Sequence, residues 1–538
     1  MKIMQNQVAE FTFRSAISHT DPFNSIKMKA TFTSPDAAAI AVPAFWAGGD
    51  RWRVRYSSAL KGVHTFVTEC SDPTDTGLHN QKGEVQIVEY VGENALYRRG
   101  SVCRRGNDLY LSYRDGTPFY WLGDTWWMGL TKRLRFPGEF AELTDDRVKK
   151  GFNVVQVVAG LYPDMLPFDE RGANEAGFPW DLEFTSVNPE YFDMADRRIA
   201  YLCERGITPC IVGCWGFFMK FAGKDVILRH WDNLIARWGA YPVCWCVAGE
   251  ANMRYYLDTE GSAEAARAQS RKDWNDVTKH VRESDPFHRL VTIHPTRYGH
   301  EQIEDDSLLD LDMLQTGHSG YMTLAPSMQI EKDALDRKKL PVIIGEACYE
   351  GIVGSSYADV QRYLYISSFM LGACGHTYGA NGIWQVNARE KPYGLSPHGT
   401  QWGETPWQEA YRLPGSRHIG DCMKFLTQFE WHRFTCRPDW IDRPCTLSAT
   451  DGCFAAGIPS EVRVVFLPVF GGPFWGEVQI LNLEEYITYK ALRFNPITNK
   501  TTELGIAMPG ADGSWTAPRV DMFGDWIYAL VAVSSLGR

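Results

Sequence analysis

Short apolar segments alternate with longer amphipathic ones through the middle of the chain, and this alternation restricts the fold more than any other feature. The apolar segments are predicted to be buried strands, at residues 119–127, 153–160, 207–216, 243–252, 289–295, 311–320, 341–351 and 374–384. Helical patterns lie between them. One runs from Pro189, which suits a helix start, to Gly206, which suits a helix end. Eight strand–helix units in a row predict an α/β fold of the (β/α)8 type, a TIM barrel.

A doubly wound parallel sheet is the alternative arrangement for such a pattern. Nucleotide-binding sheets of that kind carry a Gly-rich phosphate loop directly after a strand. No such loop follows any of the eight predicted strands. We therefore favour the barrel and expect no cofactor.

The two ends of the chain have a different pattern, in which polar and apolar residues alternate in short runs between turn residues. Examples are "AEFTFRS" near the start and "VRVVFLPVF" near the end. This pattern predicts antiparallel β-sandwiches, and 538 residues are too many for one ordinary core. We expect an N-terminal β-sandwich at 1–100, the (β/α)8 barrel at 101–435 and a C-terminal β-sandwich at 436–538.

The net charge and the cysteine pattern restrict the partners and the cellular location that the sequence predicts. The formal net charge is −10 and no basic stripe offsets it, which argues against a nucleic-acid partner. No apolar run is long enough to span a membrane, and the first residues lack the apolar core of a signal peptide. The 13 cysteines have no paired spacing, and many lie in apolar strands, which predicts reduced thiols and a cytoplasmic protein. Homo-oligomerisation stays open.

The predicted strands end in an unusual number of polar and aromatic side chains. The active site of a barrel lies where the carboxyl ends of the strands meet, and 19 Trp residues suit a flat, stackable ligand such as a sugar. Large β-rich cores also take up Trp, so a carbohydrate partner is one of two interpretations of this surplus. The candidate substrate-binding residues are Asp124, Trp126, Trp127, Gln156, Trp215, Asn252, His294, Gln315, His318, Tyr378 and Trp384, and His376 lies beside them on the last strand.

Two glutamates stand out among these strand ends. Glu250 follows "CWCVAG" at the end of the fourth predicted strand, and Glu346 follows "PVIIG" at the end of the seventh. Strands four and seven lie across a barrel mouth from each other, so the two carboxyl groups can face one another over a pocket. Paired carboxyl groups of this kind cleave glycosidic bonds. Alternatively, each glutamate has only a structural role and pairs with an arginine or caps a helix. Glu350 is expected to be a loop carboxylate and Asp124 an acceptor for a sugar hydroxyl group.

Two other hydrolytic chemistries find less support. Metal sites usually draw on close pairs such as His-x-His on one strand, whereas His294, His318 and His376 are on separate predicted strands. A serine nucleophile would need a G-x-S-x-G turn, and the sequence has none. We expect no catalytic metal.

Four segments together resemble a known family. "DGTPFYWLGDTWW", "RVKKGFNVVQVVAG", "GEAN" and "PVIIGEACYEG" are similar to the apiosidase-like (β/α)8 glycoside hydrolases, glycoside hydrolase family 140 and its relatives. The N-terminal sandwich resembles a domain that often precedes this barrel, and the C-terminal one a small domain labelled collagen-binding. The resemblance implies a retaining mechanism with the acid/base after strand four and the nucleophile after strand seven, places filled here by Glu250 and Glu346.

One position departs from the wider clan of these barrels. An Asn that binds the 2-hydroxyl group of the sugar usually precedes the acid/base, but Gly249 stands there in this chain. Asn252 or a residue of another strand would have to take over. The resulting hypothesis is an exo-acting retaining glycosidase that removes a terminal sugar, such as the furanoses apiose or arabinose, from an oligosaccharide or plant glycoside. The alternatives are a non-catalytic carbohydrate-binding protein and a metal-dependent hydrolase on the same barrel.

Overall fold

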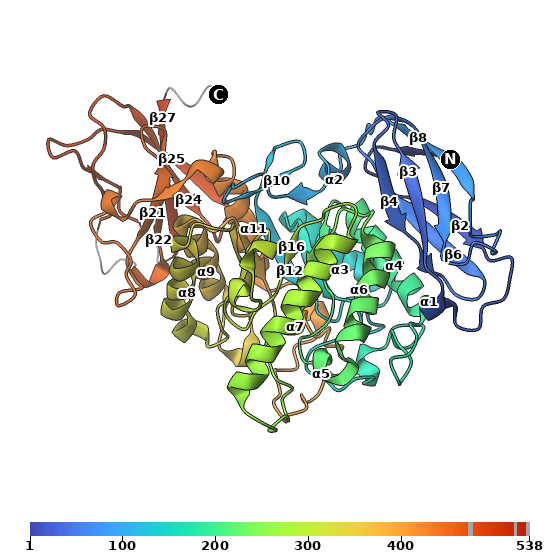
Figure 1. Cartoon of the computed structure of the whole chain (residues 1–538). Helices are drawn as coiled ribbons and strands as arrows, with labels where there is room; N and C mark the ends of the chain where they lie inside the picture. Colours follow the sequence, from blue (N-terminus) through green and yellow to red (C-terminus); the bar gives the residue numbers. More distant parts are fainter. Residues whose placement is uncertain (472–476, 521–523, 534–538) are drawn as a thin grey trace.

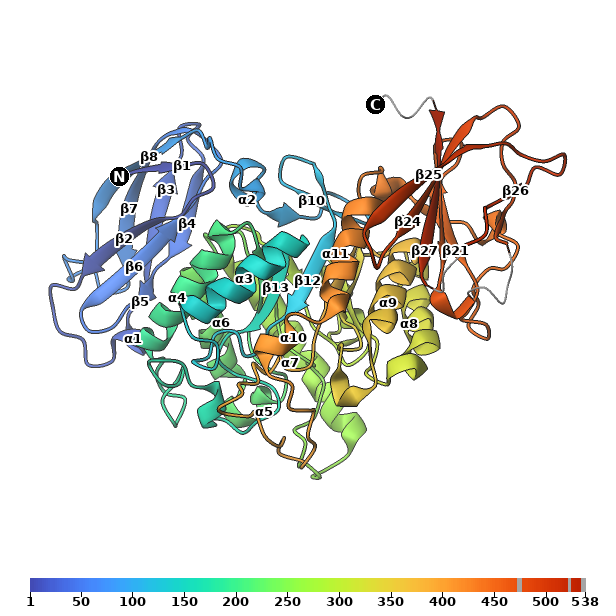
Figure 2. The same ribbon diagram turned by 180° about the vertical axis from the view of Figure 1, so that it is seen from behind.

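The computed structural model describes residues 1–471, 477–520 and 524–533. A central barrel of parallel strands and helices lies between two β-rich regions, one formed by each end of the chain (Figure 1). The same arrangement seen from behind places these two regions on opposite sides of the barrel (Figure 2).

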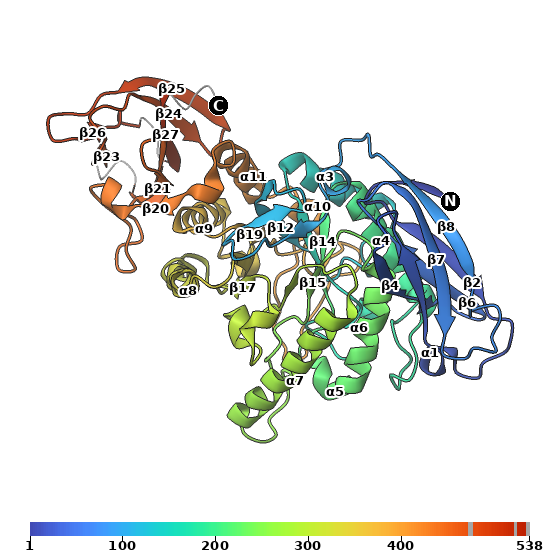
Figure 3. The same ribbon diagram turned by 45° about the horizontal axis from the view of Figure 1, so that its top comes forward.

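The barrel is one parallel sheet of eight strands, which confirms the predicted (β/α)8 class (Figure 3). Its strands, in spatial order, are β16 (Val291–Thr292), β15 (Cys244–Cys246), β14 (Thr208–Val212), β13 (Val154–Val158), β12 (Trp121–Thr125), β19 (Gly375–Tyr378), β18 (Val342–Glu346) and β17 (Asp312–Gln315). No strand pairing is recorded between β16 and β17 in the described chain. Asp310 and Val291 bridge this seam, because the Asp310 N–H donates to the Val291 carbonyl and the Val291 N–H to the Asp310 carboxylate, each at 2.8 Å.

All eight predicted segments contain a strand, but each strand is shorter than its segment. The segment predicted at 243–252, for instance, forms a strand only at Cys244–Cys246. The remaining residues belong to the loops at the carboxyl ends of the strands, where the backbone no longer follows the sheet. An apolar run predicts burial rather than extended backbone, so it cannot mark the residue at which a buried strand becomes a buried loop.

Helices α3 to α11 surround the barrel and contribute apolar side chains to its core, whereas α1 and α2 lie in the N-terminal region. The helices are α1 (Pro22–Ser25), α2 (Ala95–Arg98), α3 (Gly138–Lys150), α4 (Pro189–Glu204), α5 (Phe218–Ala222), α6 (Lys224–Trp238), α7 (Ala263–Ser284), α8 (Leu324–Asp336), α9 (Ala358–Leu371), α10 (Trp407–Ala410) and α11 (Pro414–Leu426). Helix α4 matches its prediction: the Asn188 side chain caps the first turn, Pro189 is the first helical residue, and Gly206 follows the end with φ of 79°. None of the described helices is long and apolar enough to cross a membrane.

The N-terminal region holds two sheets whose facing side chains form one hydrophobic cluster. The larger sheet contains β1 (Lys2–Met4), β8 (Lys82–Val88), β7 (Gly62–Cys70), β3 (Met28–Thr33) and β4 (Ala39–Pro43), and the smaller β2 (Ala9–Arg14), β6 (Arg51–Tyr56) and β5 (Phe45–Trp46). Phe32 and Tyr56 stack between them with ring centroids 4.0 Å apart. A small sheet of β9 (Val102–Cys103), β10 (Leu111–Tyr113) and β11 (Pro118–Phe119) then leads into the barrel.

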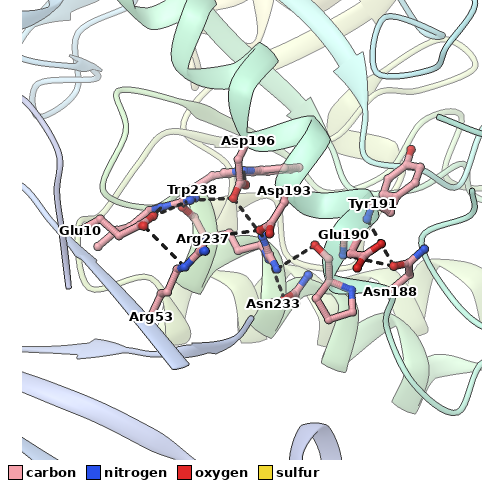
Figure 4. A network of polar contacts seen from close by, with 12 residues as sticks. Glu10, Arg53, Asn188, Glu190, Tyr191, Asp193, Asp196, Asn233, Arg237 and Trp238 are labelled. Atoms are coloured by element: carbon pink, nitrogen blue, oxygen red, sulfur yellow. Dashed lines mark hydrogen bonds and ion pairs between the residues drawn. The ribbon is translucent and has the colours of Figure 1, made fainter. Parts of the chain in front are cut away.

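A buried ionic network fastens the N-terminal region to helices α4 and α6 (Figure 4). The Asp196 carboxylate lies 2.6 Å from the Arg55 guanidinium and 2.9 Å from that of Arg237, and it also accepts the Trp238 indole N–H at 2.6 Å. Arg53 adds weaker contacts to Asp193 across the same junction. Burial opposes ionisation of Asp196, but the two arginines outweigh it and lower the pKa of the carboxyl group.

The C-terminal region has a six-stranded sheet of β20 (Thr435–Cys436), β21 (Phe454–Ile458), β22 (Val462–Leu467), β27 (Trp526–Ala532), β24 (Tyr489–Asn495) and β25 (Lys500–Ala507), and a pair formed by β23 (Gln479–Ile480) and β26 (Trp515–Thr516). One face of the larger sheet joins the hydrophobic core of the barrel, through side chains such as Phe454 and Phe494. The other face has a separate core around Trp440 and Tyr489. Residues 472–476, 521–523 and 534–538 of the predicted range 436–538 lie outside the described residues.

Candidate active site

The two glutamates reach the mouth of the barrel from opposite sides, as their strand positions predict. Glu346 is the last residue of β18 and is only 4% exposed. Glu250 lies in the loop after β15, partly exposed, with a backbone φ of 42°. A left-handed conformation at a residue other than Gly is costly and is concentrated at functional sites.

Gln315 joins the two carboxyl groups. Its side-chain N–H₂ group donates to Oε1 of Glu250 at 3.1 Å and to Oε1 of Glu346 at 3.2 Å. A register irregularity between Leu314 and Gln315 brings Gln315 directly opposite Glu346 in the β17–β18 pair, and such irregularities commonly redirect a side chain beside an active site. Since both oxygens lie within 3.2 Å of one nitrogen, their separation cannot exceed twice that distance.

Glu346 is surrounded by groups that stabilise its charge. Its Oε1 accepts a hydrogen bond from His318 Nε2 at 2.6 Å, and His294 Nε2 lies 3.1 Å from its Oε2. Burial opposes ionisation, but His294 and His318 outweigh it and lower the pKa of Glu346 to about 2. In return, Cys348 and Glu346 raise the pKa of His318 to about 10, against the effect of burial. At neutral pH the group is therefore a carboxylate beside an imidazolium.

The environment of Glu250 favours its protonated form, in contrast to that of Glu346. Burial and, next, the negative charge of Glu346 raise its pKa, although His294, Gln315 and the indole N–H of Trp215 partly oppose this. That indole donates to Glu250 Oε2 at 3.2 Å. The site thus holds one carboxyl group that favours the ionised form and one that favours the protonated form, the division that acid/base catalysis with two carboxyl groups needs.

Aromatic rings hold this arrangement in place. The His294 ring packs between the indoles of Trp127 and Trp215, at centroid distances of 5.3 and 5.9 Å. The Trp215 indole also explains Gly249, because a Cβ atom at that position would lie 2.2 Å from the ring. The place usually taken by an Asn in the wider clan is therefore filled here by a tryptophan of the neighbouring strand end.

A cavity of about 110 Å³ lies over the two carboxyl groups. Seven of the predicted site residues line it: Trp127, Trp215, Glu250, Gln315, His318, Glu346 and Trp384. Six further residues line it that the sequence did not single out: Pro163, Asp164, Tyr256, Tyr349, Ile352 and Trp402. Tyr349 lies three residues after Glu346, so proximity in the sequence could have suggested it. The other five lie in loops, whose course the sequence pattern does not reveal.

Asp124 and Trp126 do not line the cavity, contrary to the expectation that they contact a sugar. Asp124 is fully buried and accepts hydrogen bonds from Arg147 Nε at 2.5 Å, from the Trp126 indole at 2.7 Å and from the Thr125 N–H at 2.9 Å. The Trp126 ring packs against Phe140 of α3, with centroids 5.6 Å apart. These contacts join β12 to α3 and leave neither side chain free for a ligand.

Three other predicted contact residues also have partners inside the protein. Gln156 donates to the Gly345 carbonyl at 2.7 Å, and Asn252 donates to the Gln302 carbonyl at 3.1 Å. Tyr378 donates to the Glu350 carboxylate at 2.5 Å. None of the three lines the cavity. Glu350 is a buried loop carboxylate that also accepts the Gly415 N–H at 3.1 Å.

His376 faces away from the site, with its Nδ1 3.4 Å from Ser368 Oγ on α9. Within residues 1–471, 477–520 and 524–533, no three side chains of His, Cys, Asp or Glu come together in a way that could hold a metal ion. All 13 cysteines are free thiols, as their spacing predicts.

Two known domain families match the chain. The family described as "Apiosidase-like, catalytic domain" matches residues 105–433. A domain of unknown function, DUF5060, matches residues 2–71. No curated protein matches this sequence.

Several solved structures share the fold. A candidate glycoside hydrolase of Bacteroides vulgatus ATCC 8482 is 17% identical and has a TM-score of 0.70, over 99% of this chain and 100% of that one. A glycoside hydrolase family 5 protein of the same organism is 20% identical with a TM-score of 0.67, over 81% of this chain and 94% of that one. At such identities the likeness shows a common fold.

Proposed function

This chain belongs to the family of the apiosidase-like catalytic domain, and we propose that it is a retaining glycoside hydrolase with Glu346 as nucleophile and Glu250 as acid/base. The observation that carries the proposal is the Gln315 amide that holds the two carboxyl groups together, one favouring the charged form and the other the protonated form.

The separation of the carboxyl groups supports retention of configuration. The two N–H bonds of an amide diverge by about 120°, so oxygens on each of them would lie roughly 5.5 Å apart. Retaining enzymes have carboxyl groups about 5–5.5 Å apart, and inverting enzymes about 6.5–9.5 Å apart, to leave room for a water molecule. The distances from Gln315 to Glu250 and Glu346 favour the shorter class.

In the first step, the Glu346 carboxylate attacks the anomeric carbon while Glu250 donates its proton to the glycosidic oxygen. The bond to the leaving group breaks and an ester forms between the sugar and Glu346. This ester carries no charge, so the repulsion that raises the pKa of Glu250 disappears. Glu250 then accepts a proton from water, which attacks the anomeric carbon and frees the sugar with its configuration retained.

The dimensions of the site support exo action on a small terminal sugar. The cavity of about 110 Å³ is well below the range of roughly 300–1,000 Å³ for pockets that bind drug-sized ligands. We therefore propose a pentose such as apiose or arabinose, in its furanose form, as the sugar released. Trp127, Trp215 and Trp384 offer indole faces or edges to it. The cytoplasmic location stays a prediction.

A screen of aryl glycosides of pentoses and hexoses, in furanose and pyranose forms, tests the proposal. We expect release of one sugar, with Glu346→Gln and Glu250→Gln each slowing hydrolysis by more than about 1,000-fold. Proton NMR of the first product should show the anomer of the substrate. Asp145→Asn, an exposed substitution on α3, is the matched control and should leave hydrolysis unchanged. Release of the opposite anomer would refute retention, and full activity of Glu346→Gln would refute the assignment of the nucleophile.

A further inference from the structure

A third carboxyl group, that of Asp164, lines the same cavity as Glu250 and Glu346. It lies in the loop between β13 and α4, and the residue is only 3% exposed. Its Oδ2 atom is buried and has no hydrogen bond of good geometry within the described part of the chain. Among the described residues, the Trp402 indole N–H is the one side-chain donor near enough to lower the pKa of this carboxyl group. A buried acceptor without a donor is costly, and a ligand that supplies a donor would remove this cost.

The backbone holds Asp164 in an unusual conformation. Its φ is 58°, in the left-handed region, where Asp is tolerated better than most residues. Its N–H donates to the hydroxyl group of Tyr256 at 3.1 Å, and Tyr256 lines the cavity as well. Asp164 and Glu250 are thus two acidic residues with positive φ in the same cavity. The loop is fixed through its backbone, and the carboxyl group stays available to a ligand.

The cavity has carboxyl groups but no permanently charged base among its described lining residues. None of the described residues that line it is Lys or Arg. His318 is the one lining group held as a cation, and its charge is already paired with Glu346 at 2.6 Å. Burial raises the pKa of Asp164 to about 7, opposed by Trp402 and Arg171. Near neutral pH the group can therefore accept a hydrogen bond as a carboxylate or donate one as an acid.

We propose that Asp164 is a specificity-determining residue that binds a hydroxyl group of a neutral sugar, and that the cavity rejects sugars carrying a carboxylate. This inference rests on the proposed function, because it assigns the substrate class of the same site. A uronic acid would place its charge near Glu346 and Asp164 with no free cation among the described lining residues, a repulsive arrangement in a poorly solvated space. A hydroxyl group would instead satisfy the unpaired oxygen of Asp164.

The test compares wild type with Asp164→Asn on paired p-nitrophenyl glycosides, β-D-glucoside with β-D-glucuronide, together with neutral pentosides. Asn also tolerates positive φ, so the loop should keep its conformation and the melting temperature should stay within a few degrees. Glu183→Gln, an exposed substitution between the same two elements, is the control. We expect wild type to hydrolyse a neutral glycoside and not the glucuronide. Asp164→Asn should lose about 10- to 100-fold in kcat/KM on the neutral glycoside, mainly through KM.

A second measurement separates this inference from the proposed function. Quenching of the cavity tryptophans reports binding of methyl β-D-xyloside, methyl β-D-glucoside and D-glucuronate without any turnover. If no glycoside is hydrolysed, the proposed function fails, but neutral sugars should still bind wild type more tightly than Asp164→Asn and D-glucuronate should not bind. Equal affinity of the two proteins for the neutral sugars would overturn the inference. Binding or hydrolysis of the uronic acid at the level of the best neutral sugar would overturn it too, as would the absence of any sugar binding.

Discussion

Removal of the His318 charge should move the acid limb of the pH profile. His318 Nε2 lies 2.6 Å from Glu346 Oε1, and together with His294 it lowers the pKa of Glu346 from its ordinary 4.5 to about 2. At about 1.4 kcal/mol per pH unit, this difference corresponds to roughly 3 kcal/mol in favour of the carboxylate. His318→Gln keeps a hydrogen-bond donor but removes the charge, so the effect of charge can be separated from that of hydrogen bonding.

Without the imidazolium, only His294 and neutral hydrogen-bond donors such as Gln315 oppose the effect of burial on Glu346. An opposite charge in contact with a carboxyl group commonly lowers its pKa by about 1–3 units, so the pKa of Glu346 should rise from about 2 to about 3–5. It would then approach that of Glu250, and the two groups would titrate as a coupled pair. Because the acid limb of kcat/KM reports ionisation of the free enzyme, that limb should shift upward by at least about one pH unit.

The assay is the initial rate of aryl glycoside hydrolysis between about pH 2 and 8, for wild type, His318→Gln and His376→Gln. His376 is buried, its pKa is lowered to about 3 by burial, and it contacts Ser368 and Tyr365 of α9. Its substitution should lower stability but leave the acid limb in place. An acid limb in His318→Gln that coincides with that of wild type would show that the imidazolium does not hold Glu346 ionised.

Three further outcomes follow from the structure. Gly249→Ala places a Cβ atom 2.2 Å from the Trp215 ring. The crowding should lower the unfolding free energy by about 1–3 kcal/mol, measured by thermal melting, and should also lower kcat. An unchanged kcat would contradict the role of Trp215 in positioning Glu250. Asp196→Asn removes the carboxylate that Arg55 and Arg237 share and leaves them Glu10 at 2.9 Å and Asp193 at 3.2 Å. This should cost about 3 kcal/mol in urea unfolding. Since the pKa of Asp196 is lowered in the folded protein, this stabilisation should be present above about pH 4 and disappear as the pH falls through the folded-state pKa. A cost that does not depend on pH would contradict stabilisation by ion pairs of Asp196. Treatment with EDTA should leave hydrolysis unchanged, because Glu346 supplies the nucleophile and Glu250 performs the proton transfers. Loss of hydrolysis in EDTA would favour the metal-dependent alternative.

The sequence located the class of fold and the two central carboxyl groups. Eight buried apolar segments separated by amphipathic ones leave few arrangements other than a barrel, since each strand must be covered on both faces. Glu250 and Glu346 could be selected because each is a charge that directly follows an apolar strand segment. A charge in such a position can be recognised from the sequence alone, because only the local burial pattern and the residue type are needed.

The identity of the residues around those carboxyl groups could be predicted only in part. Trp127, Trp215 and Trp384 line the cavity as expected, whereas Trp126 turns outward toward Phe140 of α3. Trp126 and Trp127 are neighbours in the sequence and have the same chemistry. The direction of each ring depends on the loop that follows β12, which no periodicity describes.

What the sequence by itself determined about this protein is therefore the order of its elements and the carboxyl groups at the ends of two strands. The tertiary structure decided which partners surround those groups. Gln315 lies 65 positions from Glu250, and Asp164, Tyr256 and Trp402 reach the cavity from three separate loops. The physical reason is that pKa values and specificity depend on distances of a few ångströms between groups far apart in the chain, and only the packed structure sets those distances.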